Sequence, residues 1–147
     1  MDLFKKWFST SIQKISFEDI KYAIYNKEYI IINTLDSQSQ RCLIKGTIPS
    51  IEEEKIINQF LESYNQASVK IILYGRNSVD LSVDEKGHQL LSLGFTKVFI
   101  YSGGLFEWLL LQDIYGDDEF PTSGKCKDLL FYRGSRSLGS TPKLLSW

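Results

Sequence analysis

Three short apolar runs, each rich in β-branched or aromatic residues, alternate with amphipathic segments along most of this chain. The runs lie at residues 29–34, 69–74 and 97–101, and polar residues bound each of them. Runs of this kind are typical of strands that are buried on both faces. Strands that alternate with helices at this spacing predict a mostly parallel sheet covered by helices on both faces. We therefore expect an α/β fold of three layers, with about five strands in the central sheet.

The segments between the runs carry helix signals. Three of them begin with a Ser followed closely by acidic residues, at 16–19, 50–53 and 82–85. This pattern predicts capping boxes, in which the side chains satisfy the first N–H groups of a helix. Gly94 is the expected left-handed stop of the third helix. A Gly-Thr-Ile-Pro segment at 46–49 is expected to form a short edge strand.

The length of 147 residues fits one domain with a tail at each end. We expect an N-terminal amphipathic arm at 1–11, the α/β domain at 12–122, and a basic tail containing Ser and Gly at 123–147. The arm has apolar residues at helical spacing, which continue to Ile15. It is expected to dock on the edge of the domain, and a membrane-surface role is the less favoured alternative.

Composition excludes several classes of function. The net charge is -1, so the chain has no positive footprint for nucleic acid. No apolar run approaches the roughly 18 to 20 residues needed to span a bilayer, so a membrane protein is not expected. Two Cys and one His have neither the number nor the spacing of a disulfide framework or a metal site. We expect no metal, no other cofactor, and a reducing, cytoplasmic location.

The order of the motifs resembles the rhodanese-homology domain family. The resemblance covers about residues 12–115. It is carried by Gly-Thr-Ile-Pro at 46–49, Ile-Ile-Leu-Tyr at 71–74, Leu-Gly-Phe at 93–95, and Val-Phe-Ile-Tyr-Ser-Gly-Gly-x-x-x-Trp at 98–108. A Gly-Gly turn and a Trp at this spacing are the most specific parts of the match.

In active members of that family, the resemblance implies a Cys directly after the strand at 71–74. A six-residue loop then wraps its N–H groups around a thiolate, a persulfide or a phosphate. Gly75 stands in the Cys position of this chain, and Asp80 stands where a basic residue is usual. The resemblance therefore implies a member that lacks the active-site cysteine, so no catalytic residue is assigned.

The loop at 75–80 is nevertheless the candidate anion or ligand site, because the N–H groups at a strand-to-helix junction attract anions. Arg76 is its one cation, and Asp80 opposes an anion. The alternative is a structural turn in which Gly75 permits a tight backbone path. The candidate loop consists of Gly75, Arg76, Asn77, Ser78, Val79 and Asp80.

The expected helix at 105–115 is apolar over far more than the roughly 100° stripe that covers a sheet. Either the N-terminal aromatic residues or the segment 129–132 covers the remainder, or a partner does. The partner is an unidentified protein or a second copy of the chain. The candidate interaction surface consists of Leu105, Phe106, Trp108, Leu109 and Tyr115.

These features favour a non-catalytic rhodanese-like domain that serves as a protein-interaction or regulatory module. The alternative is a sulfurtransferase or phosphatase-like enzyme that uses a relocated cysteine, either Cys42 or Cys126. Lys125 and Lys127 flank Cys126, and neighbouring cations make a thiol more reactive. Whether the chain is an enzyme therefore depends on these two residues, because the loop at 75–80 has no nucleophile of this kind.

Overall fold

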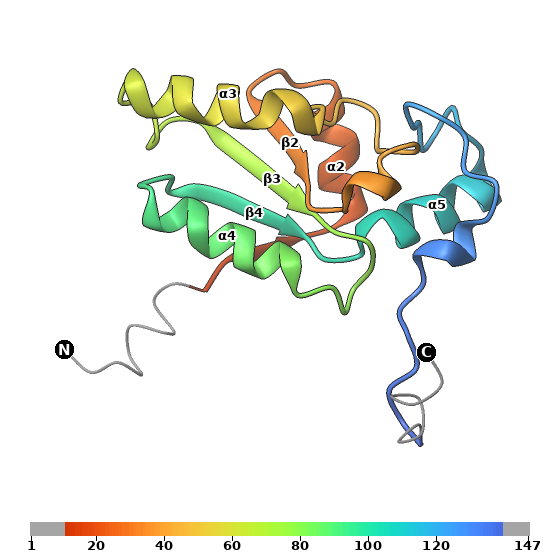
Figure 1. Ribbon diagram of the computed structural model, residues 1–147. Coiled ribbons are helices and arrows are strands. Elements are labelled where there is room, and N and C mark those ends of the chain that lie inside the picture. The colour runs from red at the N-terminus through yellow and green to blue at the C-terminus, as the bar shows by residue number, and fades with distance from the viewer. Residues whose placement is uncertain (1–10, 140–147) are drawn as a thin grey trace.

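Four parallel strands form the central sheet of the computed structural model, which describes residues 11–139 (Figure 1). The order across the sheet is β1-β4-β3-β2. The α/β class and the parallel sheet confirm the prediction, although the sheet has four strands instead of about five. The strands are β1 (Gln13–Ile15), β2 (Tyr29–Asn33), β3 (Lys70–Tyr74) and β4 (Lys97–Tyr101).

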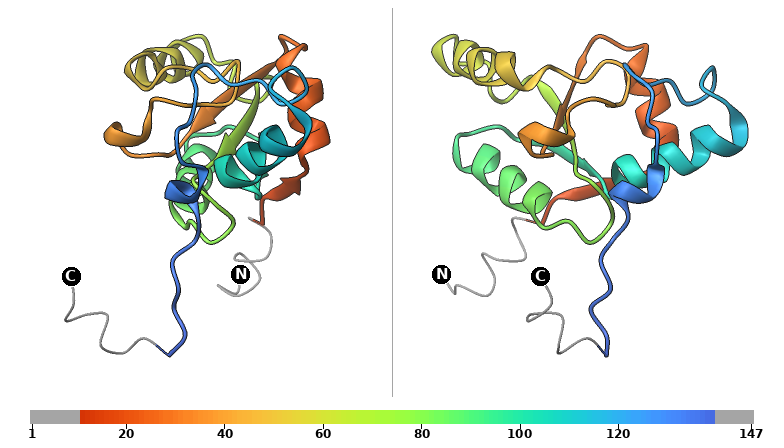
Figure 2. Two further views of the ribbon diagram at one scale, coloured as in Figure 1. Left: turned by 90° about the vertical axis from the view of Figure 1, so that its right-hand side faces the viewer. Right: turned by 45° about the vertical axis from the view of Figure 1, so that its right-hand side comes forward.

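Helices cover both faces of the sheet, as the views of Figure 2 show. One face carries α2 and α5, and the other carries α3 and α4. The α-helices among the described residues are α2 (Phe17–Ile24), α3 (Ser50–Glu62), α4 (Ser82–Ser92) and α5 (Gly104–Tyr115); the short 3₁₀ helices there are η1 (Ser37–Ser39) and η2 (Leu129–Tyr132).

Residues along β3 alternate between the two cores because successive side chains of a strand point to opposite faces. Ile71 and Leu73 pack with α3 and α4, whereas Ile72 and Tyr74 pack with α2 and α5. All four are buried. Burying one large aliphatic side chain contributes roughly 1.5 to 3 kcal/mol, so each face of β3 anchors a separate layer of helices.

The first strand corrects one prediction. Helical spacing was expected to continue to Ile15, but residues 13–15 form β1 and pair with β4. Ile12 lies beside α4, where a Cβ at Gly87 would collide with its side chain. Pairing with β4 and contact with α4 thus override the local helical pattern of this segment.

The segment at 46–49 is not a strand of the sheet. Thr47 makes a single parallel bridge to Ile31, and the Ile48 N–H donates to the Ile31 carbonyl at 2.8 Å. Pro49 follows immediately and is the N-cap of α3. Because proline has no N–H to donate, the pairing stops after one bridge.

Only the first predicted capping box is present among the three. The Asp19 carboxylate accepts from the Ser16 N–H at 3.0 Å at the start of α2. Ser50 instead lies inside α3, and its hydroxyl donates to Gln40 at 2.9 Å. Ser82 lies inside α4 and donates to Asp80 at 2.7 Å. Gly94 has φ of +100° after α4, which confirms it as the left-handed stop.

Residues 117–132 pack on the domain instead of beginning a tail at 123. Thr122 forms an antiparallel bridge with Ile44, and the Ser123 N–H donates to the Leu43 carbonyl at 2.8 Å. The helix η2 then packs on α5. Residues 133–139 that follow are exposed and extend away from the domain (Figures 1 and 2). The packed part of the molecule thus continues about ten residues beyond the expected boundary at 122.

The predicted arm at 1–11 lies almost entirely outside the described residues, as does the end of the chain from 140 to 147. Within residues 11–139, no helix is long and apolar enough to cross a membrane.

Candidate functional site

The loop at 75–80 joins β3 to α4 at the carboxyl edge of the sheet, and the carboxylate of Asp80 folds back into it. One oxygen accepts from the Arg76 N–H at 2.9 Å. The other accepts from the Ser82 N–H at 2.9 Å and from the Ser82 hydroxyl at 2.7 Å. Asp80 therefore takes donors that an external anion would otherwise find at this junction.

Because Gly75 has no side chain, the Asp80 carboxylate can occupy the space next to it. A Cβ at position 75 would lie 2.5 Å from Oδ2 of Asp80 and 3.2 Å from Oγ1 of Thr34. Thr34 in turn shares a hydrogen bond of 2.8 Å with the Ser82 hydroxyl. A side chain at position 75 would thus point into a set of polar groups that are already paired with one another.

Burial alone would raise the pKa of the Asp80 carboxyl. Hydrogen bonds from the Arg76 N–H and from Ser82, together with the Arg76 charge, outweigh this effect and hold the pKa below its usual value. The carboxylate is consequently charged at neutral pH. An additional anion beside it would meet like charge.

Arg76 is held by the C-terminal segment. Its guanidinium donates to the Phe131 carbonyl and, at 3.0 Å, to the Ser39 hydroxyl. It also lies 4.5 Å from the centre of the Phe131 ring and 5.0 Å from that of Tyr132. Contacts of this kind between a guanidinium and aromatic rings are attractive. The one cation of the predicted loop is therefore engaged within the chain.

The middle of the loop is bound to the same segment. The Asn77 amide donates to the Tyr132 carbonyl at 2.9 Å, and the Asn77 side-chain oxygen accepts from the Val79 N–H at 3.1 Å. Ser78 and Val79 remain exposed. The six predicted residues thus lie together in one loop, and the backbone around Phe131 and Tyr132 covers part of it.

The Gly-Gly turn before α5 brings that helix against the loop. The N–H groups of Leu105 and Phe106 donate to the carbonyls of Gly75 and Arg76 at 2.9 and 2.8 Å. Gly104 has φ of +70°, and a Cβ there would lie 2.9 Å from the Asn77 nitrogen. Only glycine allows this close backbone approach.

The candidate interaction surface on α5 is mostly interior. Leu105, Trp108 and Leu109 are buried in the core, so they do not present an exposed face. Phe106 is half-buried, whereas Tyr115 is 63% exposed. The helix is apolar all round because the sheet, Phe120 and η2 each cover part of it. Of the alternatives that the sequence left open, the structure shows the segment 129–132 packing on this helix, while Ile114 and Tyr115 stay exposed.

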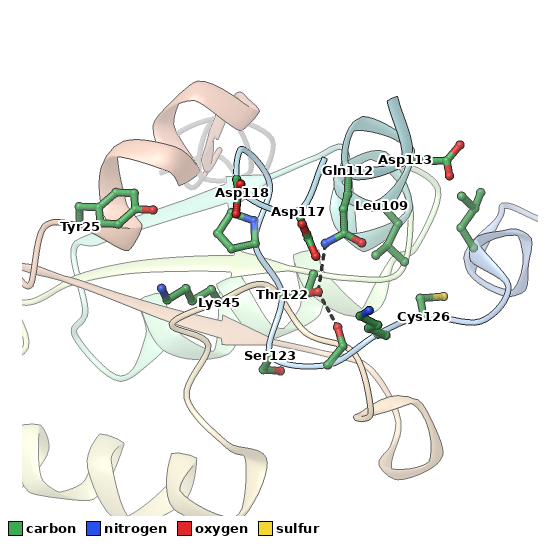
Figure 3. Close-up of a pocket in the computed structure, with 14 residues that line it drawn as sticks. Tyr25, Lys45, Leu109, Gln112, Asp113, Asp117, Asp118, Thr122, Ser123 and Cys126 are labelled. Atoms are coloured by element: carbon green, nitrogen blue, oxygen red, sulfur yellow. Dashed lines mark hydrogen bonds between the residues drawn. The ribbon is translucent and has the colours of Figure 1, made fainter. Parts of the chain in front are cut away.

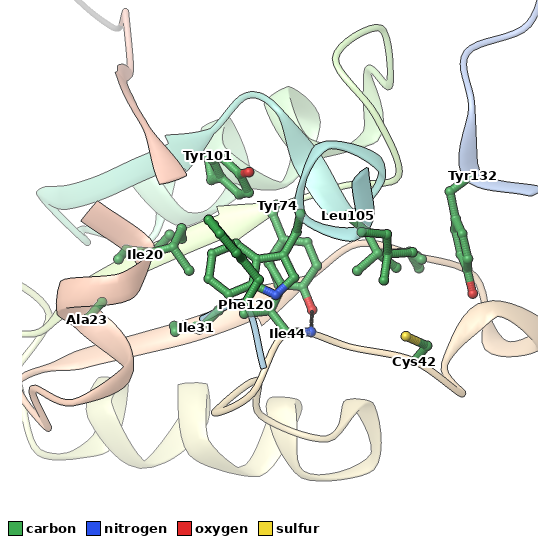
Figure 4. Packing of buried hydrophobic residues seen from close by; sticks show 14 residues of the cluster. Ile20, Ala23, Ile31, Cys42, Ile44, Tyr74, Tyr101, Leu105, Phe120 and Tyr132 are labelled. Carbon is green, nitrogen blue, oxygen red and sulfur yellow. Dashed lines mark hydrogen bonds between the residues drawn. The ribbon is translucent and has the colours of Figure 1, made fainter. Parts of the chain in front are cut away.

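The two cysteines lie on different segments near the same core, which Figure 4 shows around Cys42. Cys42 is buried, and its thiol lies 3.6 Å from the Gly124 carbonyl. Cys126 is half-buried and packs against the cluster that contains Cys42. Burial raises the pKa of the Cys42 thiol. Neither cysteine belongs to the loop at 75–80.

Sequence reasoning missed a cleft of about 870 Å³ beside α5, shown in Figure 3. It forms where α5 meets the segment that returns after Gly116, and the packing of that segment had no signal in the sequence. Gln112 and Thr122, which share a hydrogen bond of 3.1 Å, lie in its wall. No group of three or more His, Cys, Asp or Glu residues suited to a metal occurs in the part of the chain described.

Comparisons with known proteins agree with this architecture. The Alr3790 protein from Anabaena sp. superimposes with a TM-score of 0.53 at 23% identity, covering 75% of this chain and 91% of that one. The BH2092 protein from Bacillus halodurans gives 0.56 at 16%, covering 82% and 83%. A complex of an EanB variant with hercynine gives 0.56 at 15%, covering 78% of this chain and 28% of EanB. These likenesses show the fold. No curated protein matched in sequence.

The sheet order and the helices on both faces define a parallel three-layer α/β domain, and the loop after β3 lies at the carboxyl edge of its sheet. A family model described as "Rhodanese-like domain" matches residues 18–111, which is well over half of the chain. The chain belongs to the rhodanese-like domain family.

Proposed function

We propose that this chain is a non-catalytic rhodanese-like domain that acts as a protein-interaction or regulatory module. The observation that carries the proposal is the position of Asp80. Its carboxylate fills the space in front of Gly75 and takes the donors of the loop. A loop that is filled from within the chain has neither the nucleophile nor the free anion site that sulfur or phosphate transfer needs.

The burial of Cys42 supports the same proposal against the enzyme alternative. A nucleophilic thiol is normally accessible and has a lowered pKa, whereas Cys42 is buried and its pKa is raised. Cys126 is more accessible but lies outside the loop. A sulfurtransferase or phosphatase-like activity that uses a relocated cysteine would therefore have to depend on Cys126.

A cyanide assay tests the proposal. The chain is incubated with thiosulfate and cyanide, and thiocyanate is measured beside a Cys126→Ser variant; phosphatase activity is measured with p-nitrophenyl phosphate. We expect the wild-type chain and the variant to give the same background rate in both assays. Turnover that Cys126→Ser abolishes would overturn the proposal in favour of the enzyme alternative.

Partner binding is tested by substituting the exposed apolar residues of α5. Ile114 and Tyr115 are 69% and 63% exposed at the end of the helix, and Ile51 on α3 is 90% exposed. An Ile114→Asp/Tyr115→Asp variant is compared with Ile51→Asp as the matched control in pull-downs and in sedimentation. The proposal expects a complex or dimer that only the α5 variant loses. Association that is equal in both variants would place the partner surface elsewhere.

A further inference from the structure

Residues 123–132 cover part of the loop at 75–80. They contact the rest of the domain close to the thiols of Cys42 and Cys126. Gly124 lies so close to the backbone at Arg41 that a Cβ there would collide with the Arg41 carbonyl. The Cys42 thiol approaches the Gly124 carbonyl at 3.6 Å, two residues before Cys126. The part of the chain that carries Cys126 is therefore held directly against the part that carries Cys42.

Both cysteines belong to one packed cluster. Cys126 packs against the buried residues that include Cys42, Leu105 and Tyr132. An interaction with the Cys126 thiol adds to the effect of burial in raising the pKa of Cys42. Among residues 11–139 both thiols are free, so no disulfide uses either of them.

The two thiols differ in access. Cys42 is 1% exposed, whereas Cys126 is half-buried and lies in the wall of the cleft beside α5 (Figure 3). A small oxidant in that cleft therefore reaches Cys126 first. Redox-sensitive cysteines are accessible and often lie next to a second Cys that resolves the sulfenic acid as a disulfide.

We propose that Cys42 and Cys126 are an oxidisable pair, and that a peroxide-class oxidant converts them into a disulfide that fastens residues 123–132 to the domain. In the first step with hydrogen peroxide, the Cys126 thiol attacks one oxygen, the O–O bond breaks, and Cys126 sulfenic acid and water form. In the second step, the Cys42 sulfur attacks the Cys126 sulfur and the S–O bond breaks. The departing hydroxyl takes the Cys42 proton as a second water. The two sulfurs lose two electrons, and the peroxide gains them.

The disulfide would affect the loop at 75–80 through Tyr132. Its ring is buried in the same cluster as Cys42, and its carbonyl holds the Asn77 amide. A disulfide six residues before Tyr132 shortens the free chain that can carry this residue away from the loop. Oxidation therefore keeps residues 129–132 in place over the loop at 75–80. Formation of the disulfide between Cys42 and Cys126 does not depend on whether the loop at 75–80 is catalytic.

Mass spectrometry of the full chain tests the pair. The reduced protein is treated with hydrogen peroxide, unfolded, and capped with N-ethylmaleimide. Cleavage after glutamate separates a Cys42 peptide ending at Glu52 from a Cys126 peptide beginning after Glu119. We expect the two peptides to be joined, the protein to lose two hydrogens in mass, and dithiothreitol to restore two capped thiols.

The half-buried position of Cys126 makes Cys126→Ser the informative variant, because it leaves the core intact. Peroxide is expected to slow hydrogen exchange in 75–80 and 129–132 several-fold in the wild-type chain, and to change nothing in the variant. Sulfinic acid on Cys126 beside a free Cys42, disulfides only between separate molecules, or two capped thiols after peroxide would each overturn the proposal.

Discussion

At position 75, the missing side chain and the Asp80 carboxylate are parts of one arrangement. A Cβ on Gly75 would lie 2.5 Å from the carboxylate, and that carboxylate is pinned by Arg76 and Ser82. The residue types alone show that Asp80 opposes an anion. That Asp80 also fills the site depends on how the loop turns back, which neither periodicity nor propensity encodes.

Replacing Asp80 tests its structural role. Asp80→Ala is expected to lower the free energy of unfolding at pH 7 by about 1 kcal/mol, because three donors lose their acceptor; the value is reduced for the partial exposure of the carboxylate. The measurement is urea unfolding. Glu54→Ala, at an exposed position on α3, is the control and is expected to have an effect near zero.

The lowered pKa of Asp80 predicts that the stability difference between the wild-type chain and Asp80→Ala depends on pH. The folded pKa of Asp80 is lowered, so its contribution to stability is fully present above the unfolded value of about 3.9. It is lost as the pH falls through the lower, folded pKa. Unfolding curves at pH 7 and near pH 3 should therefore show the wild-type advantage over Asp80→Ala shrinking with acid. An advantage that stays constant or grows would contradict the lowered pKa.

At the scale of the elements, α5 is apolar on several sides because several parts of the chain pack against it. Trp108 packs edge-to-face against Tyr101 and Phe120, and its indole N–H donates to the Pro121 carbonyl at 3.1 Å. The sequence left open whether the chain or a partner covers this helix. The answer depends on the path of the chain after Gly116, a contact between distant segments that no local pattern contains.

Two substitutions on α5 separate its buried and exposed sides. Trp108→Ala is expected to lower the free energy of unfolding by about 3 to 5 kcal/mol, because it leaves a cavity and removes the indole N–H that donates to the Pro121 carbonyl. Ile114→Ala on the same helix is expected to change it by less than about 0.5 kcal/mol. Denaturant unfolding measures both. Similar losses in the two variants would mean that α5 does not pack as described.

The strands show where sequence reasoning succeeds and where it fails. The runs that became β2, β3 and β4 were predictable because strands buried on both faces are continuously apolar. β1 was not, since its three residues become a strand only by pairing with β4. The capping patterns at Ser50 and Ser82 failed for a similar reason. Each hydroxyl found a partner outside the predicted box, in Gln40 and Asp80.

At the scale of the whole molecule, residues 117–132 pack against the structure that residues 11–116 build. Composition predicted a basic tail from residue 123, and residues 133–139 are exposed. Before that point, apolar side chains outweigh the basic ones, and Tyr132 is buried beside α5. Composition averaged over a segment hides a short apolar stretch of this kind.

Tyr132→Ala tests whether this packing reaches the loop. Because the ring anchors the carbonyl that holds Asn77, the variant is expected to lose about 2 to 4 kcal/mol of stability. It is also expected to speed hydrogen exchange in 75–80. Leu138→Ala, at a position that is 84% exposed, is the control and should change neither. Unchanged exchange in the loop of Tyr132→Ala would show that the segment does not protect it.

The central claim is that the loop after β3 is filled from within by Asp80, and a double-mutant cycle with Gly75→Cys tests it most directly. The φ angle of Gly75 is not left-handed, so the cost of a side chain there is steric. We predict that Gly75→Cys lowers the free energy of unfolding by about 1 to 3 kcal/mol in the wild-type chain. The cost should be smaller by about 1 kcal/mol or more in the Asp80→Ala background. An equal cost in both backgrounds would contradict the account.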